Sequence, residues 1–239
     1  MNVLIACEES QRTCMEFRKR GHNAFSADLQ EPSGGHPEWH ILGDCLPILQ
    51  GGRFATMDGT VHEVDRWDLI IAHPPCTYLS NAATRSHSLK RTPIEKINAR
   101  TMQRIDAMRL FMAFVNAPCD RIAIENPVGI MNTAYRKPDQ IIEPYMFAED
   151  EGDAENYVTK ATCLWLKGLP LLTHKADADA AKGQSTLFGG CIERPNNLET
   201  YGRTPSGKVK CWCDTSVRNP KVRSKTFTGI AKAFAEQWG

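Results

Sequence analysis

Cys76 is the residue of this sequence best suited to covalent chemistry. It directly follows Pro74 and Pro75, just after the apolar run 67–72. A thiolate is a strong nucleophile, its formation depends on surroundings that lower the pKa of the thiol, and the two prolines stiffen the backbone that presents it. Glu125 is an acid that follows another apolar run. Cys76 is therefore a candidate nucleophile with an acidic partner, although one of nine cysteines can follow two prolines without a catalytic role.

Acidic residues also follow three earlier apolar runs. They are Glu8 after residues 3–7, Asp28 after residues 23–27, and Asp44 after residues 40–42. The carboxyl ends of parallel strands share one edge of an open sheet, and ligands bind beyond that edge. We therefore expect these acids to line one site together with Cys76 and Glu125. Each of them taken singly is also consistent with an ordinary loop residue.

The first of these turns argues against a phosphate ligand. It reads Cys7-Glu-Glu-Ser-Gln11 and contains no glycine. A pyrophosphate needs a close backbone approach and positive potential, whereas two carboxylates repel it. The sequence therefore disfavours dinucleotide and P-loop functions. A cofactor with an adenine, a ribose and a cationic methionine end would tolerate these acids.

The order of elements predicts an α/β fold. The run 3–7 is typical of a buried parallel strand, and it is followed by a helix that Ser10 would cap, with Cys14 and Phe17 facing inward. The strand 23–27 comes next, so the first 28 residues form a βαβ unit. Further strands are expected at 40–42, 67–72, 121–124 and 162–166. A closing helix is expected at 228–238.

The clearest helix is expected at residues 92–116. Thr92 would cap it, Pro93 would take its first position, and Glu95 would complete a capping box. Its inward face should carry the apolar residues that recur at helical spacing. These are Ile94, Ile97, Ile105, Met108, Met112 and Val115.

We expect a Rossmann-like sheet with helices on both faces and a small irregular insertion. The core would comprise residues 1–172, the insertion residues 173–220, and a closing helix of the core residues 221–239. The insertion is rich in Gly, Pro, Asn, Lys and Arg and shows little periodicity.

Composition indicates an ordinary globular protein. The 239 residues carry a net charge of +1 and are 41% apolar. No apolar run is long enough to span a bilayer and the start lacks a signal peptide, so we expect a soluble cytoplasmic protein whose cysteines are reduced. Two segments, 85–109 and 202–225, each carry seven basic residues. They favour a nucleic-acid partner, although each is also consistent with a solvated face.

The ordered set of motifs resembles the DNA cytosine-5 methyltransferase family, in particular its small phage-type members. The matching segments occur in the order that the family has and cover roughly residues 1–172 and 221–239. They are Val3-Leu-Ile-Ala-Cys-Glu-Glu-Ser10, Phe25-Ser-Ala-Asp28, Gly43-Asp44, Asp68-Leu-Ile-Ile-Ala-His-Pro-Pro-Cys76 with Ser80, Ile124-Glu-Asn-Pro127, and the terminal helix.

The resemblance implies a role for each of these residues. Cys76 would add to carbon 6 of cytosine, and Glu125 would hydrogen-bond to ring nitrogen 3 and the exocyclic amine. The methyl group would come from S-adenosylmethionine, and the substrate would be DNA with its target base flipped out. Residues implied in cofactor binding are Glu8, Ser10, Asp28, Asp44, Pro74 and Thr228. Residues implied in substrate binding are Ser80, Asn126, Lys160, Thr162, Lys208, Lys210 and Lys221, with Asn126 also holding the loop.

The sequence departs from the family pattern in ways that bear on the substrate. Glu8-Glu9-Ser10 replaces a glycine-rich turn, Thr77 stands where glutamine is common, and Pro127 replaces a valine. The strand that holds the flipped base has only Lys160 and Thr162 as counterparts. A methyltransferase acting on RNA or a free nucleotide, and a non-catalytic decoy that binds DNA or cofactor, therefore stay open as alternatives.

A zinc site is not expected in the insertion. Cys191, Cys211 and Cys213, with His174, supply candidate ligands, but Cys211 and Cys213 are separated by one residue where structural zinc sites usually have two to four.

Overall fold

A computed structural model of the chain describes residues 1–84, 92–174, 192–212 and 223–239. Its centre is a seven-stranded sheet with the order β3-β2-β1-β6-β7-β9-β8. The strands are β1 (Asn2–Ala6), β2 (Asn23–Asp28), β3 (His40–Leu42), β6 (Leu69–Ala72), β7 (Ile122–Pro127), β8 (Gln140–Ile142) and β9 (Thr162–Lys167).

The strand order confirms the expected fold class. Neighbours from β3 to β7 are parallel, whereas β9 is antiparallel to both β7 and β8. With the hairpin strands β4 and β5 left out, the order is that of a six-stranded doubly wound sheet with one antiparallel strand inserted near an edge. This arrangement is consistent with the Rossmann-like methyltransferase fold that the sequence predicts.

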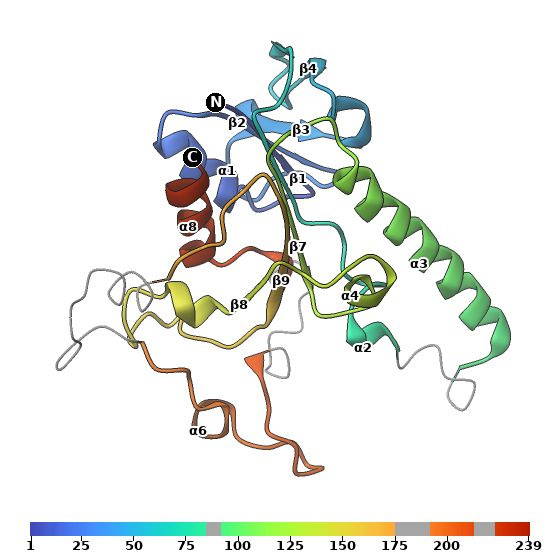
Figure 1. Ribbon diagram of the computed structural model, residues 1–239, viewed down its shortest axis with the longest axis vertical. Coiled ribbons are helices and arrows are strands. Elements are labelled where there is room, and N and C mark those ends of the chain that lie inside the picture. The colour runs from blue at the N-terminus through green and yellow to red at the C-terminus, as the bar shows by residue number, and fades with distance from the viewer. Residues whose placement is uncertain (85–91, 175–191, 213–222) are drawn as a thin grey trace.

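Helices cover both faces of the sheet. Figure 1 shows α1 (Arg12–Lys19) and α8 (Thr228–Trp238) on one side of the sheet and α3 (Ile94–Val115) on the other. Alternate strand residues point to opposite faces. Val3, Ile5 and Ile71 therefore pack with the α1 and α8 residues, whereas Leu4 and Ile70 pack with the α3 residues.

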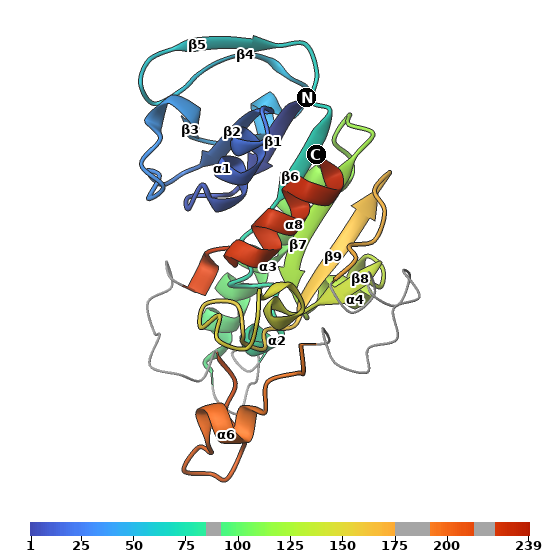
Figure 2. The same ribbon diagram turned by 90° about the vertical axis from the view of Figure 1, so that its left-hand side faces the viewer.

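The remaining elements are short. They are β4 (Gly52–Ala55) and β5 (Val61–Val64), the helices α2 (Asn81–Thr84), α4 (Met131–Ala134) and α6 (Asn197–Tyr201), and the 3₁₀ turns Pro37–Trp39, Leu46–Ile48 and Pro144–Phe147. The β4-β5 hairpin is not predicted from the sequence. It is held to the core by Phe54, which packs against Phe25 and Trp67. Figures 1 and 2 show the hairpin at one end of the molecule and α2, α4 and α6 at the other.

The predicted cap of the first helix is wrong. α1 begins at Arg12, and the residue that accepts its unpaired backbone N–H groups is Glu8. The Glu8 carboxylate accepts from the N–H of Thr13 at 2.6 Å and from that of Cys14 at 3.1 Å. Ser10 Oγ lies 3.5 Å from the nitrogen of Arg12, which is a long contact. Each oxygen of the Glu8 carboxyl accepts from a different N–H group, so this one side chain serves both donors.

The long helix also differs from its prediction. α3 begins at Ile94 with Pro93 at the cap position, and no side chain caps it. Its buried residues are Phe111 and Phe114, whereas Ile94 is 50% exposed. The helical period is correct, but only the last turns cover the sheet, and Figure 1 shows the beginning of α3 extending away from it. The burial of this helix is therefore decided by where it crosses the sheet.

The predicted strand limits hold to within a few residues. The strands β3 and β9 and the helix α8 match their predictions closely, while β6 begins two residues later and β7 continues through Pro127. Of the expected insertion, the structure describes residues 173–174 and 192–212, including α6. The division of the chain into domains stays a prediction.

The closing helix should contribute strongly to stability. Trp238 is fully buried, stacks on Phe234 at 4.7 Å between ring centroids, and donates its indole N–H to Pro170 O at 3.0 Å. We expect Trp238→Ala to lower the free energy of unfolding by about 3–5 kcal/mol, measured by denaturant titration. Glu236→Ala removes only an exposed ion pair with Arg20 and should cost less than about 1 kcal/mol. Equal losses in the two variants would contradict this assignment.

Candidate active site

Cys76 lies in a short loop beyond β6, at the carboxyl edge of the parallel strands. Its side chain is exposed, and its carbonyl accepts from the N–H groups of Leu79 at 3.1 Å and Ser80 at 3.0 Å. The sulfur therefore stands on a tight turn at the position that the sequence predicts.

This loop is fastened to the segment that follows β7. Ser80 forms a β-bridge with Gly129, and Ile130 N–H donates to Leu79 O at 2.8 Å. A Cβ atom at Gly129 would come within 2.0 Å of Leu79 O, so only glycine allows this approach. The chain around Ser80 thus couples Cys76 to the strand that carries Glu125.

Asn126 joins the same two segments from inside the protein. It is buried, and its side-chain amide donates to Pro74 O at 2.6 Å. Asn126 therefore makes the contact that was expected to hold the loop. It joins the side-chain amide of Asn126 to the backbone carbonyl of Pro74, and both are predicted site residues. Contacts of Asn126 with substrate and of Pro74 with cofactor stay predictions.

Glu125 is paired with a histidine that the sequence analysis did not single out. Its Oε2 lies 3.0 Å from Nδ1 of His73, and the two side chains are 17% and 8% exposed. Burial raises the pKa of Glu125, but the hydrogen bond from His73 and the charges of His73 and Lys160 outweigh it, so the pKa lies below its ordinary value. Glu125 is thus held as a carboxylate. The signal in the sequence was a histidine at a strand end, directly before the two prolines.

The surroundings of Cys76 do not favour its thiolate in the protein alone. Although Cys76 reaches solvent, the surrounding protein displaces part of the water that would stabilise a thiolate. This desolvation and the negative charge of Glu125 raise the pKa of the Cys76 thiol, while Lys160 and Arg223 oppose them. The cysteine is therefore mainly a thiol near neutral pH. Its activation depends on positive charge close to the sulfur.

Lys160 connects this centre with the chain that follows the insertion. Its ammonium group donates to Arg223 O at 3.2 Å and lies 5.6 Å from the ring centroid of Trp212 and 5.4 Å from that of Phe227. Thr162 is buried, and its hydroxyl donates to Lys160 O at 3.1 Å. The structure thus brings Lys160 to Cys76 and Glu125, whereas Thr162 supports the backbone of Lys160.

The first turn adopts left-handed backbone conformations without glycine. Cys7 has φ 60° and Gln11 has φ 58°. Gln11 is fully buried, and its side-chain amide donates to His36 O at 2.8 Å and accepts from His36 N–H at 3.0 Å. The side-chain network of Gln11 therefore offsets the cost of its backbone conformation, which is of order 1–3 kcal/mol.

Glu8 is buried beside His73 rather than exposed to solvent. Burial raises the pKa of Glu8, and the charge of His73 together with the N–H donors of Thr13 and Cys14 opposes that rise. Both carboxylate oxygens are engaged by the start of α1. Cofactor contacts of Glu8 and of the buried Ser10 stay predictions.

Asp28 and Asp44 lie together at the ends of β2 and β3. The N–H of Gly43, which directly precedes Asp44, donates to Asp28 O at 2.9 Å. Asp28 accepts through its side chain from Gln30 N–H at 2.9 Å, and the exposed Asp44 accepts from Leu46 N–H at 3.0 Å. The two carboxylates are thus fixed near each other on the side of β1 opposite Cys76.

The segment before α8 is brought to the first turn by an arginine. Arg12 donates to Thr226 O at 2.8 Å and pairs with Glu155 at 2.7 Å. Thr228 Oγ1 accepts from the Asn156 amide at 3.0 Å, and Asn156 Oδ1 accepts from Gly229 N–H at 2.9 Å. Arg12 of α1 thus contacts the segment before α8, whereas a shared site of Ser10 and Thr228 stays a prediction. Arg12 and Asn156 were not among the predicted site residues.

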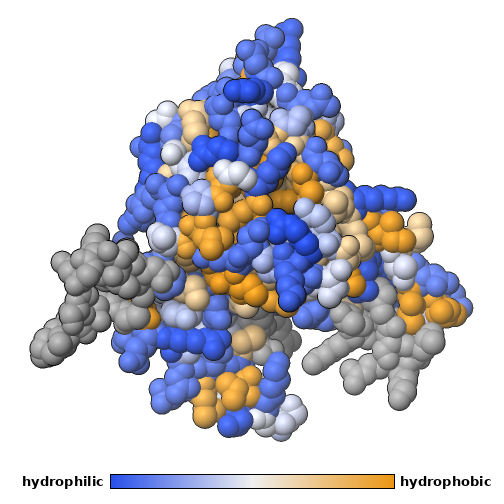
Figure 3. All heavy atoms as spheres, viewed as in Figure 1, coloured by the Kyte–Doolittle hydropathy of each residue, from blue (hydrophilic) through white to orange (hydrophobic). Residues whose placement is uncertain are grey.

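The described part of the insertion projects at the edge of the sheet that carries Cys76 (Figures 1 and 2). Lys208 is exposed and Lys210 half-buried in a turn closed by the Arg203–Val209 bridge. In Figure 3 this end of the molecule carries hydrophilic residues beside hydrophobic ones. Leu198 of α6 is 43% exposed. Lys221 lies outside the described residues.

The described part of the chain has neither a candidate metal site nor a membrane-spanning helix. No three of its His, Cys, Asp or Glu side chains gather as a metal site, and Cys191 and Cys213 lie outside it. No described helix is long and apolar enough to span a membrane.

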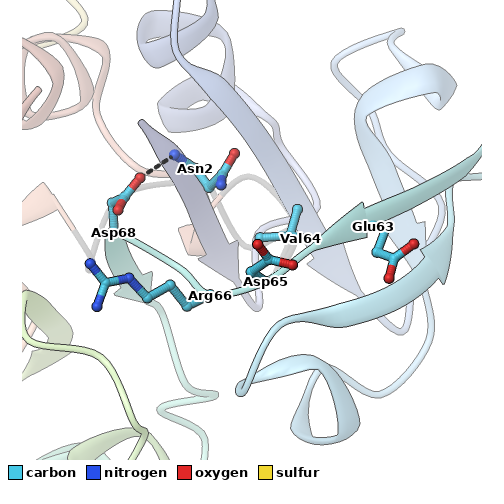
Figure 4. A pocket seen from close by; sticks show the side chains of 6 residues that line it. All are labelled: Asn2, Glu63, Val64, Asp65, Arg66 and Asp68. Atoms are coloured by element: carbon cyan, nitrogen blue, oxygen red, sulfur yellow. Dashed lines mark hydrogen bonds between the residues drawn. The ribbon is translucent and has the colours of Figure 1, made fainter.

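A depression of about 530 Å³ lies at the opposite end of the sheet (Figure 4). It is lined by Asn2, Glu63, Val64, Asp65, Arg66 and Asp68, and Asn2 N–H donates to Asp68 there at 2.8 Å. None of the predicted site residues lines it. The candidate active site is therefore the carboxyl edge, as the sheet topology requires.

One solved structure that resembles the chain is that of a prophage-encoded E. coli protein proposed to be a DNA modification methyltransferase. The two share 12% sequence identity with a TM-score of 0.41, over 86% of this chain and 55% of the other. This chain thus spans little more than half the length of that protein. Neither a protein-family model nor a curated protein sequence matches the chain.

The electrostatics of the site predict opposite effects of two substitutions on the Cys76 thiol. Glu125→Gln removes a negative charge and should lower the pKa of Cys76, so alkylation by iodoacetamide at neutral pH should accelerate. Lys160→Met removes a positive charge and should slow it. Peptide mass spectrometry at Cys76 measures both rates, and Arg109→Met is a distant control. Changes in the same direction would show that packing, not charge, governs the thiol.

Proposed function

We propose that this protein transfers a methyl group from S-adenosylmethionine to carbon 5 of cytosine in DNA through a covalent adduct with Cys76. The observation that carries the proposal is the pairing of an exposed cysteine with a buried carboxylate at neighbouring strand ends. Asn126 and the Ser80 bridge hold the two segments together. This is the arrangement that the resemblance to the cytosine-5 methyltransferases implies.

The chemistry needs both residues. Carbon 5 of cytosine is a poor nucleophile toward a methyl group until a nucleophile adds to carbon 6. The Cys76 thiol gives its proton to water and its sulfur bonds to carbon 6, while Glu125 passes a proton from solvent to ring nitrogen 3 and so stabilises the electron-rich adduct. Carbon 5 then takes the methyl group. Loss of the carbon 5 proton and cleavage of the carbon–sulfur bond restore the ring and the enzyme.

The residues at the sheet edge fit S-adenosylmethionine. When bound, it supplies an electrophilic methyl group on a cationic sulfur. Asp28 and Asp44 offer acceptors for ribose hydroxyls and an adenine amine, and the turn at Glu8 and Ser10 with Thr228 would receive the methionine end. Glu8 and Glu9 place two acidic side chains in this turn, which suits a cationic group better than a phosphate.

DNA is the substrate that the basic segments favour. A stacked cytosine hides the faces of its ring, so attack by Cys76 requires the base to be flipped out of the duplex. Ser80 and Lys160 lie near the cysteine, Thr162 supports the backbone of Lys160, and Lys208, Lys210 and Lys221 would neutralise phosphates beyond them. The projection of the insertion at this edge supports that role.

The covalent step can be tested by trapping. Duplex DNA with 5-fluorocytosine should form an adduct at Cys76 in the presence of S-adenosylmethionine, because fluorine cannot leave as a proton does. Cys76→Ser should abolish the adduct, and Glu125→Gln should slow its formation about tenfold or more. Mass spectrometry of the cross-linked peptide is the measurement.

The same assay separates the alternatives. Labelled S-adenosylmethionine is incubated with DNA, RNA and free nucleotides, and the position of the label is followed. Label in RNA or nucleotides alone would replace DNA as substrate, and cofactor binding without any transfer would indicate a decoy. An adduct that survives Cys76→Ser would overturn the mechanism.

Cofactor binding should depend on the two aspartates. Asp28→Ala or Asp44→Ala removes an acceptor from a polar group of the ligand, so affinity for S-adenosylmethionine should fall by about 1–3 kcal/mol, or roughly 5- to 150-fold, by calorimetry. Asp106→Ala, on the exposed part of α3, is the control. Unaltered affinity in both site variants would move the cofactor elsewhere.

A further inference from the structure

His73 contacts Glu125, which the proposed reaction uses. The family resemblance assigns no role to His73. Its ring is buried at the end of β6, and Nδ1 lies 3.0 Å from Oε2 of Glu125. The register of the sheet places it there, because Ala72 pairs with Ile124 and the next residues are His73 and Glu125. Both side chains therefore lie at the same level of neighbouring strands.

The second ring nitrogen of His73 is a further observation that calls for an explanation. Nε2 of His73 is buried and has no hydrogen-bond partner among the described residues. A buried polar atom without a partner costs free energy, and such atoms in native proteins call for an explanation, often a functional one. The ring of His73 thus hydrogen-bonds to Glu125 through Nδ1, while Nε2 lacks a partner within the described part of the chain.

The pairing fixes what Glu125 can do. Donation to Oε2 requires a hydrogen on Nδ1, which both the Nδ1–H tautomer and the imidazolium carry, so this bond excludes the Nε2–H tautomer. With Oε2 held by His73, Oε1 makes no hydrogen bond within the described part of the chain. Oε1 is therefore the oxygen left for a ligand beside Cys76.

We propose that His73 is a positioning residue, which holds Glu125 through Nδ1–H so that Oε1 meets the edge of the base that Cys76 attacks. This inference rests on the proposed function and adds a residue to it. His73 acts through Glu125 and does not itself touch the base. The charged groups around the His73–Glu125 pair are Glu8 from the first turn and Lys160 before β9.

Replacing His73 by asparagine or by glutamine tests which of its two ring nitrogens matters. The side-chain nitrogen of an asparagine can occupy the place of Nδ1, whereas that of a glutamine reaches the place of Nε2. His73→Asn should therefore keep most of the rate of adduct formation with 5-fluorocytosine DNA. His73→Gln and His73→Ala should lose about 10- to 100-fold, the effect of a hydrogen bond to a charged group. Affinity for S-adenosylmethionine should be unchanged in all three, and thermal unfolding checks that each is folded.

A second measurement does not depend on activity. NMR titration of protein labelled with ¹³C at the glutamate carboxyls reports the pKa of Glu125, whose signal is the one missing in Glu125→Gln. Burial raises this pKa and the His73 bond lowers it, so it should rise in the Ala and Gln variants and rise less in the Asn variant.

The two measurements separate the claims. If the wild type forms the adduct and all three His73 variants react equally fast, the positioning role is overturned while the proposed function stands. A Glu125 titration unchanged by His73→Ala overturns the pairing in the same way. If the wild type reacts with no DNA, RNA or nucleotide while Glu125 titrates as expected, the proposed function falls but the pairing stands. Loss of reaction in Gln and Ala with retention in Asn supports both.

Discussion

The register between β6 and β7 is the constraint on which the candidate site depends. Ala72 pairs with Ile124, so the chain leaves β6 at His73 and Pro74 directly beside Glu125 and Asn126. Two hydrogen bonds follow from this placement, from His73 to Glu125 and from Asn126 to Pro74. A slip of one residue would turn the Glu125 side chain to the opposite face of the sheet and separate both pairs. The parallel ladder thus does more for the site than any single loop contact.

Charge within the site is balanced by groups from distant parts of the chain. Glu125 raises the pKa of Cys76, and Lys160 lowers it. Lys160 also lies against the rings of Trp212 and Phe227, on either side of residues 213–222. Trp212 within the basic segment 202–225, Phe227 just after it and the state of the nucleophile are therefore linked through one ammonium group. Any ligand that adds positive charge or removes the negative charge of Glu125 would favour the thiolate.

The first turn shows how a site can be built without the glycines that usually permit it. Cys7 and Gln11 adopt left-handed conformations at its two ends, and Glu8 occupies the start of α1 with its own carboxylate. An acidic side chain of the protein thus accepts from N–H groups of the kind that bind phosphate at the start of a helix. The exclusion of phosphate ligands, expected from the composition of this turn, stays a prediction.

The sequence alone determined the fold class and the edge at which the polar residues meet. Its apolar runs are the buried strands, and a strand buried on both faces reads as a continuous run whatever its neighbours are. The acids after β1, β2 and β3 and the cysteine after β6 therefore gather at one edge, because parallel strands end together. Local spacing sufficed for these statements, since each depends on a few consecutive residues.

The tertiary structure decided which polar groups touch. His73 and Glu125 are 52 positions apart, and only the pairing of β6 with β7 makes them neighbours. Glu8 and not Ser10 caps α1, because the turn folds the carboxyl group back onto two N–H groups. The helix α3 buries Phe111 rather than Ile94, because only its end crosses the sheet. A helical period identifies a stripe of side chains, but the position of the sheet along the helix decides how much of that stripe is buried. Such contacts join segments far apart in the chain, and their geometry is fixed only when the core packs.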